Sequence, residues 1–189
     1  MARCIRVIDQ GTTYNERWDK LQRKVMVTFE LPNAIIEDEG ELKGQPHAIS
    51  NFYTFSMNEK ANMRTDLESW RGRKFTDSEA EKFDILNLLD VPAYVNVIHN
   101  DKDGKTYANI ASIMPLPDGI ECPAAINEVY SFSLEREDYT PEALNKLSEK
   151  MQDRIKQSRE WQALNAGVAD EPQGQPQDDG FDPNSEIPF

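Results

Sequence analysis

The sequence predicts a mainly β domain of the α+β class, and three observations support this prediction. Residues 24–31 and 48–57 are rich in β-branched and aromatic side chains, as strands are. Residues 93–99 and 105–113 alternate on either side of an Asp-Gly turn, which is the strongest short-range signal of a β-hairpin. Residues 76–79 form a capping box, which predicts that a helix precedes the hairpin.

The first two predicted strands are residues 24–31 and 48–57, and the second of them contains a candidate for ligand contact. Lys24–Leu31 ends at Pro32, and residues 33–45 follow it as an acidic loop. In residues 48–57 apolar side chains alternate with polar ones, except that Phe52 stands on the polar face. We therefore expect Phe52 either to form an exposed platform for stacking or to be covered by the N-terminal residues.

The densest group of basic and aromatic residues is Trp70-Arg71-Gly72-Arg73-Lys74-Phe75, for which we expect a third strand. Its cations are candidates for phosphate contacts, and Trp70 is a candidate for stacking or for a cation–π contact. The alternative is that Trp70 and Phe75 belong to the core while the cations face solvent. We favour the first interpretation because the cluster stands out against an acidic background.

The N-terminal residues 1–22 combine four basic residues with Tyr14 and Trp18. Cations neutralise phosphates and rings stack on bases, so such an arm suits a nucleic acid. The alternative is that Trp18 caps the core. The full set of predicted DNA-binding residues is Trp18, Lys24, Phe52, Tyr53, Trp70, Arg71, Arg73, Lys74, Lys105 and Tyr107.

The sequence predicts no metal, no cofactor and no enzymatic activity. The two histidines and two cysteines are isolated from one another and give no metal-ligand spacing. A nuclease would need convergent carboxylates that hold a metal-bound water. Asp84, Asp101 and Asp103 are available, but two of them lie in the predicted hairpin turn and no metal motif frames them.

The composition also indicates a compartment. No apolar run is long enough to span a bilayer, and the N-terminus lacks a signal-peptide core, so we expect no membrane partner. Two isolated cysteines do not form a disulfide framework and suit a reducing cytoplasm.

Residues 140–165 predict an amphipathic helix. Thr140 is the expected N-cap and Pro141 the first helical residue. The apolar stripe of this helix consists of Leu144, Leu147, Met151 and Ile155. We expect the stripe to dock on the body of the protein, and self-association as a homodimer is the alternative.

Residues 166–189 contain six acidic residues and no Lys or Arg, interleaved with Gln, Gly and Pro. This composition predicts a disordered acidic tail, for which a solubilising role is the general interpretation. Phe181, Ile187 and Phe189 add an apolar tip that solubility does not require. We expect the tip to enter a basic-rimmed apolar pocket on a partner. The predicted partner-binding residues are Asp178, Asp179, Phe181, Asp182, Glu186, Ile187, Pro188 and Phe189.

The acidic run that ends in Ile187-Pro188-Phe189 resembles the C-terminal tip of bacterial single-stranded DNA-binding proteins. Residues 70–116 contain the stretches Trp-Arg-Gly-Arg-Lys-Phe, Phe-Asp-Ile-Leu-Asn-Leu-Leu, Val-Asn-Val-Ile-His and Gly-Lys-Thr-Tyr-Ala-Asn-Ile. With these stretches the region resembles a family of tailed-bacteriophage proteins regarded as single-stranded DNA-binding proteins. The resemblance implies a replication or recombination factor in the bacterial host cytoplasm that coats single strands and recruits partner proteins through its tail.

The predicted order of three strands, a helix and a two-stranded hairpin is that of an OB-fold, a five-stranded barrel with a helix before strand four. We expect this domain over residues 1–139. The amphipathic helix of residues 140–165 and the tail of residues 166–189 follow it.

Together these features predict a non-enzymatic protein that binds and protects single-stranded DNA with little sequence dependence. Charge opposes the prediction, because the net charge is −13. Without the six acidic residues of the tail, 28 acidic residues still face 21 basic ones. The alternative is an acidic adaptor or DNA mimic that occupies a partner's DNA site and binds no oligonucleotide.

Overall fold

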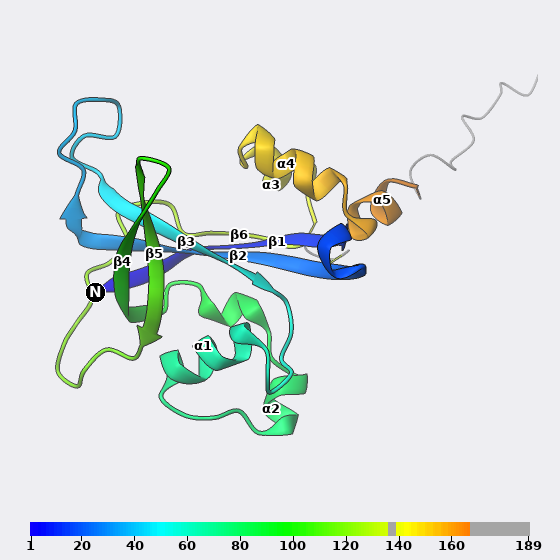
Figure 1. Ribbon diagram of the computed structural model, residues 1–189, viewed down its shortest axis with the longest axis horizontal. Helices are drawn as coiled ribbons and strands as arrows, with labels where there is room; N and C mark the ends of the chain where they lie inside the picture. The colour runs from blue at the N-terminus through cyan, green and yellow to red at the C-terminus, as the bar shows by residue number, and fades with distance from the viewer. Residues whose placement is uncertain (136–138, 167–189) are drawn as a thin grey trace, which may run out of the picture.

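The computed structural model describes residues 1–135 and 139–166 (Figure 1). The predicted acidic tail from residue 167 onward, with all of the predicted partner-binding residues, lies outside the described residues. The structure therefore addresses the predicted domain and the helical segment that follows it.

The fold is built on an antiparallel sheet in which the strands follow the order β3-β2-β1-β4-β5. The mainly β prediction is thus confirmed. A short strand, β6, runs parallel to β1 and pairs with it. Among the described residues β3 and β5 do not pair with each other, so the sheet is not closed into a barrel. The strands are β1 (Ala2–Asn15), β2 (Lys20–Ile35), β3 (Pro46–Thr54), β4 (Pro92–Lys102), β5 (Lys105–Met114) and β6 (Tyr130–Phe132).

Helices cover the sheet from two sides (Figure 1). One group connects β3 to β4 and consists of α1 (Asn62–Arg71), α2 (Asp77–Glu81) and the 3-10 turn η2 (Ile85–Leu88). The other group follows β6 and consists of α3 (Pro141–Asn145), α4 (Glu149–Lys156) and α5 (Arg159–Ala166). A further 3-10 turn, η1 (Glu16–Trp18), joins β1 to β2.

β1 is buried on both of its faces, because successive side chains of a strand point in opposite directions. Val7 belongs to a core with Phe29 and Trp70, on the side of α1. Ile8 belongs to a second core with Ile155, on the side of α3–α5. Each fully buried side chain of this size contributes about 1.5–3 kcal/mol, so both helical groups stabilise the sheet.

Three local predictions are confirmed. β4 and β5 form the predicted hairpin, and its turn places Asp103 and Gly104 at φ of 52° and 73°, as an Asp-Gly turn requires. The capping box is present, since the Thr76 hydroxyl accepts from the Glu79 amide at 3.2 Å while the Glu79 carboxylate accepts from the Thr76 amide at 2.9 Å. The Thr140 hydroxyl caps α3 as predicted.

The N-terminal residues form a strand and not the basic arm that the sequence suggested. β1 pairs with β2 from Arg3 to Asn15. A strand that is covered on both faces lacks the alternation that marks a half-buried strand. A register shift between Asp9 and Gly11 in the pairing with β2 also interrupts the two-residue alternation of side chains along β1. These two features explain why the strand was missed.

The strand predicted around Trp70 is instead the helix α1. Its buried apolar residues Met63, Leu67 and Trp70 are spaced by three and four positions, which is the period of a helix. Gly72, at φ of 71°, ends the helix in the left-handed conformation that favours glycine.

Residues 140–165 form a series of short helices and not one continuous helix. The stripe docks on the body as expected, since Leu144 and Ile155 are buried in the second core. Ser158 lies between α4 and α5 and is fully buried. Its hydroxyl donates to the Ile155 carbonyl at 2.6 Å and accepts from the Trp161 amide at 3.3 Å. Serine competes for backbone hydrogen bonds in this way and so favours helix ends.

Glu30 on β2 anchors the long connection between β5 and β6. Its side chain is fully buried and accepts hydrogen bonds from the Ile126 amide, the Asn127 amide and the Asn127 side chain at 2.7–2.9 Å. Burial acts to raise the pKa of Glu30, but the three hydrogen bonds outweigh it and lower the pKa. The buried carboxylate is therefore stabilised in its charged form.

The docking of the α4–α5 corner on β1 can be tested at Gly11. A Cβ at Gly11 (φ +71°) would collide with the Ser158 side chain and lie 2.8 Å from Leu134 Cδ1. Gly104 has φ +73° and nothing within 4 Å of its Cβ position among the described residues. Alanine costs about 1–2 kcal/mol of backbone strain at either site, and only Gly11→Ala adds the collision.

We expect Gly11→Ala to lower the melting temperature at least twice as much as Gly104→Ala. Thermal unfolding followed by circular dichroism measures both variants. Equal losses would mean that the helices do not pack on β1 at this point.

Candidate nucleic-acid interface

A polar groove of about 580 Å³ lies where β3 separates from β2 and the chain turns toward α1. We call it the lysine groove because three lysines line it: Lys20 and Lys24 from β2, and Lys60 from the segment before α1. Phe52 of β3 lines the same groove. Amide and hydroxyl side chains supply much of the remaining lining, among them Gln22, Asn51, Thr54, Ser56, Asn58 and Asn62. Tyr53, Ala61, Met63 and one carboxylate, that of Asp66, also line the groove.

The two-residue period of β2 brings its groove residues together. Lys20, Gln22 and Lys24 stand at alternate positions and so share one face of the strand. Lys24 is paired with Thr54 across the two strands, and its Nζ donates to Thr54 Oγ1 at 2.6 Å. The next cross-strand pair on the same face of the sheet places Phe52 opposite Met26. Cations and an aromatic ring are thus held by one rigid pair of strands.

The pKa of Lys24 in the lysine groove is lowered for two reasons. Partial burial lowers the pKa of Lys24, and the like charge of Lys20 lowers it further. Both effects disfavour the charged ammonium in the free protein. A phosphate group in the groove would favour it, because an opposite charge stabilises the protonated form.

Phe52 keeps 52% of its surface exposed, which settles the alternative in which the N-terminal residues cover it. Those residues are part of the sheet as β1. A ring that is exposed beside lysines offers a stacking face for a base and cations for the adjoining phosphates.

Two of the predicted DNA-binding residues, Trp70 and Tyr53, are buried in the core, which corrects the expectation that Trp70 stacks on a base. Trp70 is 5% exposed, packs on Phe29 with ring centroids 5.1 Å apart, and donates from Nε1 to the Pro92 carbonyl at 2.9 Å. Tyr53 is 7% exposed and its hydroxyl donates to Asp66 at 2.9 Å. Burial and the nearby carboxylate raise the pKa of Tyr53. Trp70 is therefore a core residue, whereas Tyr53 is mostly buried but lines the floor of the lysine groove beside Phe52 and Lys24.

The predicted cations next to Trp70 lie at the C-terminal end of α1, and none of them lines the lysine groove. Arg71 and Arg73 both donate to Glu79 Oε1, at 2.9 and 2.7 Å. The Arg71 guanidinium also lies 4.1 Å from the centre of the Phe75 ring. The side chain of Arg73 is 61% exposed and Lys74 is exposed. Arg71 therefore contributes to the fold through Glu79 and Phe75, while Arg73 and Lys74 remain accessible.

The remaining predicted residues, Trp18, Lys105 and Tyr107, lie on or next to the turns that join β1 to β2 and β4 to β5. Trp18 is 60% exposed on η1, with the Arg17 guanidinium 5.5 Å from its ring centre, so it does not cap the core. It stands two residues before Lys20. Lys105 and Tyr107 lie at the exposed end of the β4–β5 hairpin.

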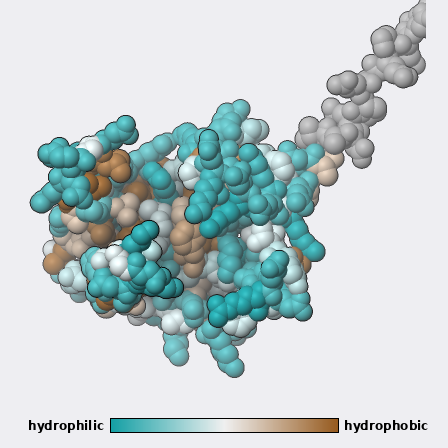
Figure 2. Space-filling view, turned by 45° about the horizontal axis from the view of Figure 1, so that its top comes forward, coloured by the Kyte–Doolittle hydropathy of each residue, from teal (hydrophilic) through white to brown (hydrophobic). Residues whose placement is uncertain are grey.

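Apolar surface gathers at the end of the molecule that carries this hairpin, whereas the side that carries α4 and α5 is largely hydrophilic (Figure 2). The exposed apolar residues on the hairpin are Tyr94, Ile98, Tyr107 and Met114. Tyr94 and Met114 are directly paired across the two strands.

Lys20 and Lys60 line the groove but were not among the predicted DNA-binding residues. The signal for Lys20 was present in the sequence, since Lys20, Gln22 and Lys24 share a face once the strand is extended to its true start. No pattern in the sequence predicts that Lys60 joins these residues, because its position depends on the path of the chain between β3 and α1.

No group of three or more His, Cys, Asp or Glu side chains that could hold a metal ion occurs within residues 1–135 and 139–166. In the same part of the chain no helix is long and apolar enough to cross a membrane. No protein-family model, curated protein or solved structure matches this chain.

The ion pairs at the end of α1 make a testable contribution to stability. Hydrogen bonds from Arg73, from the Thr76 amide and from Arg71 hold the pKa of Glu79 well below its usual range. A carboxylate with a lowered pKa contributes stability above its unfolded pKa of about 4.3 and loses it as the pH falls. Glu79→Gln keeps a capping side chain but removes this charge.

We expect Glu79→Gln to lower the melting temperature at pH 7, with a difference from the wild type that shrinks between pH 4.5 and pH 2.5. Glu81→Gln, at an exposed position in the same helix, is the matched control and should change little at any pH. A Glu79→Gln difference that stays constant with pH would contradict the ion-pair assignment.

Proposed function

We propose that this protein binds single-stranded DNA with little sequence dependence, through the lysine groove and the exposed ring of Phe52. The observation that carries the proposal is the gathering of three lysines and a stacking ring in one groove of a protein with a net charge of −13. Grooves that track the backbone of a single strand combine cations with aromatic platforms in this way.

The topology supports an OB-fold. The order β3-β2-β1-β4-β5, with α1 between β3 and β4, is the one expected of a five-stranded OB-fold. β3 and β5, the two ends of the order, come into contact. OB-folds bind oligonucleotides on the face of strands 2 and 3 and on the loops between strands 1–2 and 4–5. The lysine groove, Trp18 and the pair Lys105–Tyr107 occupy the corresponding places.

The acidic tail has a separate part in the proposal. Its apolar and acidic residues would recruit replication or recombination proteins, as the resemblance to bacterial single-stranded DNA-binding proteins implies. The host would then be a bacterium infected by a phage, and the role would be to coat and protect single strands during replication or recombination.

The proposal is tested by fluorescence anisotropy of a labelled oligo-dT against a matched duplex over a series of salt concentrations. We expect the single strand to bind more tightly and to weaken as salt rises. Absence of binding to both DNAs would leave the acidic adaptor or DNA mimic as the better hypothesis.

The lysines should set the salt dependence. For single strands the slope of log K against log salt is about −0.7 for each phosphate neutralised. Replacing Lys20, Lys24 and Lys60 with alanine should therefore reduce the slope by about 2. A control triple variant in the C-terminal helices has the same net charge and should keep the wild-type slope: Lys146→Ala, Lys150→Ala and Lys156→Ala. If the slope of log K against log salt falls equally in both triple variants, the loss is due to net charge and the lysine groove is not the DNA-binding site.

Phe52→Ala should weaken oligo-dT binding by about tenfold or more, because a stacked base contributes about 1–3 kcal/mol. Its salt slope should not change, since no phosphate contact is lost. Tyr94→Ala, at an exposed ring outside the groove, is the matched control and should bind as the wild type does. An unchanged affinity for Phe52→Ala would remove this ring from the interface.

A further inference from the structure

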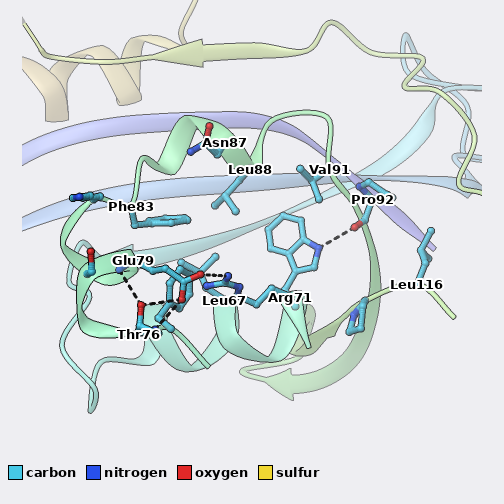
Figure 3. Close-up of a pocket in the computed structure, with 15 residues that line it drawn as sticks. Leu67, Arg71, Thr76, Glu79, Phe83, Asn87, Leu88, Val91, Pro92 and Leu116 are labelled. Carbon is cyan, nitrogen blue, oxygen red and sulfur yellow. Dashed lines mark hydrogen bonds and ion pairs between the residues drawn. The ribbon is translucent and has the colours of Figure 1, made fainter. Parts of the chain in front are cut away.

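An apolar pocket opens between α1, α2 and the start of β4 (Figure 3). Its volume is about 730 Å³, which is within the range of pockets that bind small ligands. Leu67, Trp70 and Leu88, each more than nine-tenths buried, supply much of its lining, together with Phe83 and Leu116. It shares no lining residue with the lysine groove.

The walls of this pocket are held by contacts of their own. α2 ends at Glu81, and the chain that follows packs Phe83 edge-on against Phe75 with ring centroids 5.3 Å apart. Across the pocket, the hydrogen bond from Trp70 Nε1 to the Pro92 carbonyl fixes the start of β4 against α1 (Figure 3). The pocket is therefore preformed.

The rim of the pocket is positively charged. Arg71 and Lys82 line it, and the carboxylate of Glu79 in the same lining is already held by Arg71 and Arg73. Arg71 Nη1 is buried and has no hydrogen-bond partner among the described residues. An acidic group at the mouth of the pocket would be attracted by the charges of Lys82 and of the Arg71 guanidinium. The pocket thus suits an occupant that is both apolar and acidic.

This chain contains a segment with that chemistry. Residues 178–189 have no Lys or Arg and combine four carboxylates with Phe181, Ile187 and Phe189. We propose that Ile187 and Phe189 of the same chain occupy the pocket, with Glu186 facing Arg71 and Lys82. Apolar side chains would then leave water while the acidic ones meet the basic rim.

The length of the chain permits this contact. The 23 residues from 167 to 189 follow α5 and can span at most about 80 Å. A domain of about 166 residues has a radius of gyration of about 15 Å and is roughly 40 Å across. The segment can therefore reach the pocket on its own molecule. A tethered segment also competes at a high effective concentration against untethered ligands.

The consequence is that the predicted partner-binding residues are held by their own chain until a partner displaces them. This contact leaves the lysine groove open, since the two sites have separate linings. The inference does not rest on the nucleic-acid proposal, and its test uses no DNA.

The test is photo-crosslinking of the full chain with Phe189 replaced by p-benzoylphenylalanine, which keeps an apolar aromatic side chain. After irradiation, mass spectrometry of the digested monomer should place the crosslinks on pocket residues within 67–92 and 115–116. Crosslinks to Lys20, Phe52 or Lys60, a covalent dimer, or no crosslink at all would each overturn the proposal.

Charge reversal at the rim provides the matched comparison. Lys82→Glu should reduce the yield of the pocket crosslink by about fivefold or more, because it removes an ion pair and adds a repulsion. Lys102→Glu makes the same change of net charge at an exposed position on the β4–β5 turn and should leave the yield unchanged. Equal yields in the two variants would overturn the role of the basic rim. Melting temperatures of both variants verify that each is folded.

Discussion

Val7 and Ile8 are neighbours on β1, and each needs its own apolar cover because their side chains leave the strand on opposite faces. The segment between β3 and β4 supplies one cover. The other comes from β6 and the helices α3–α5, which the chain reaches only after it has completed the hairpin of β4 and β5. Residues 139–166 are therefore the second half of a core that includes β1.

This arrangement decides where a ligand can approach. The C-terminal helices cover the outer side of β1, and they leave open the start of β2 and the end of β3, where the lysine groove lies. The type of cation differs between the interior and the groove. Arg23 donates to Asp9 and Glu135, and Arg64 donates to Glu68 and to two carbonyls. Arginine suits such fixed, multiple hydrogen bonds, whereas lysine is a mobile point charge that suits an irregular phosphate backbone. Net charge alone therefore does not indicate whether a DNA interface is present.

Sequence patterns predicted the local structure correctly where that structure depends on residues that are close together in the sequence. The capping box of Thr76 and Glu79 and the Asp103-Gly104 turn are such cases, and both are present. The patterns were misleading where structure depends on distant contacts. β1 has no alternation because helices from the far end of the chain cover it. The Trp70–Lys74 stretch is compact in sequence, but the helix sends Trp70 into the core and Glu79 binds two of its cations. The groove itself joins residues that are about 40 positions apart, and no local pattern brings them together.

The buried carboxylate of Glu30 has a consequence for the order in which the protein can form during its synthesis. β2 leaves the ribosome early, but the amides that satisfy Glu30 belong to Ile126 and Asn127, almost 100 residues later. An ionised carboxylate that is buried without partners is strongly unfavourable. The nascent hairpin of β1 and β2 must therefore keep this end hydrated until the later connection emerges. Closure of this connection over β2 would then be a late step of folding, just before β6 and the C-terminal helices complete the second core.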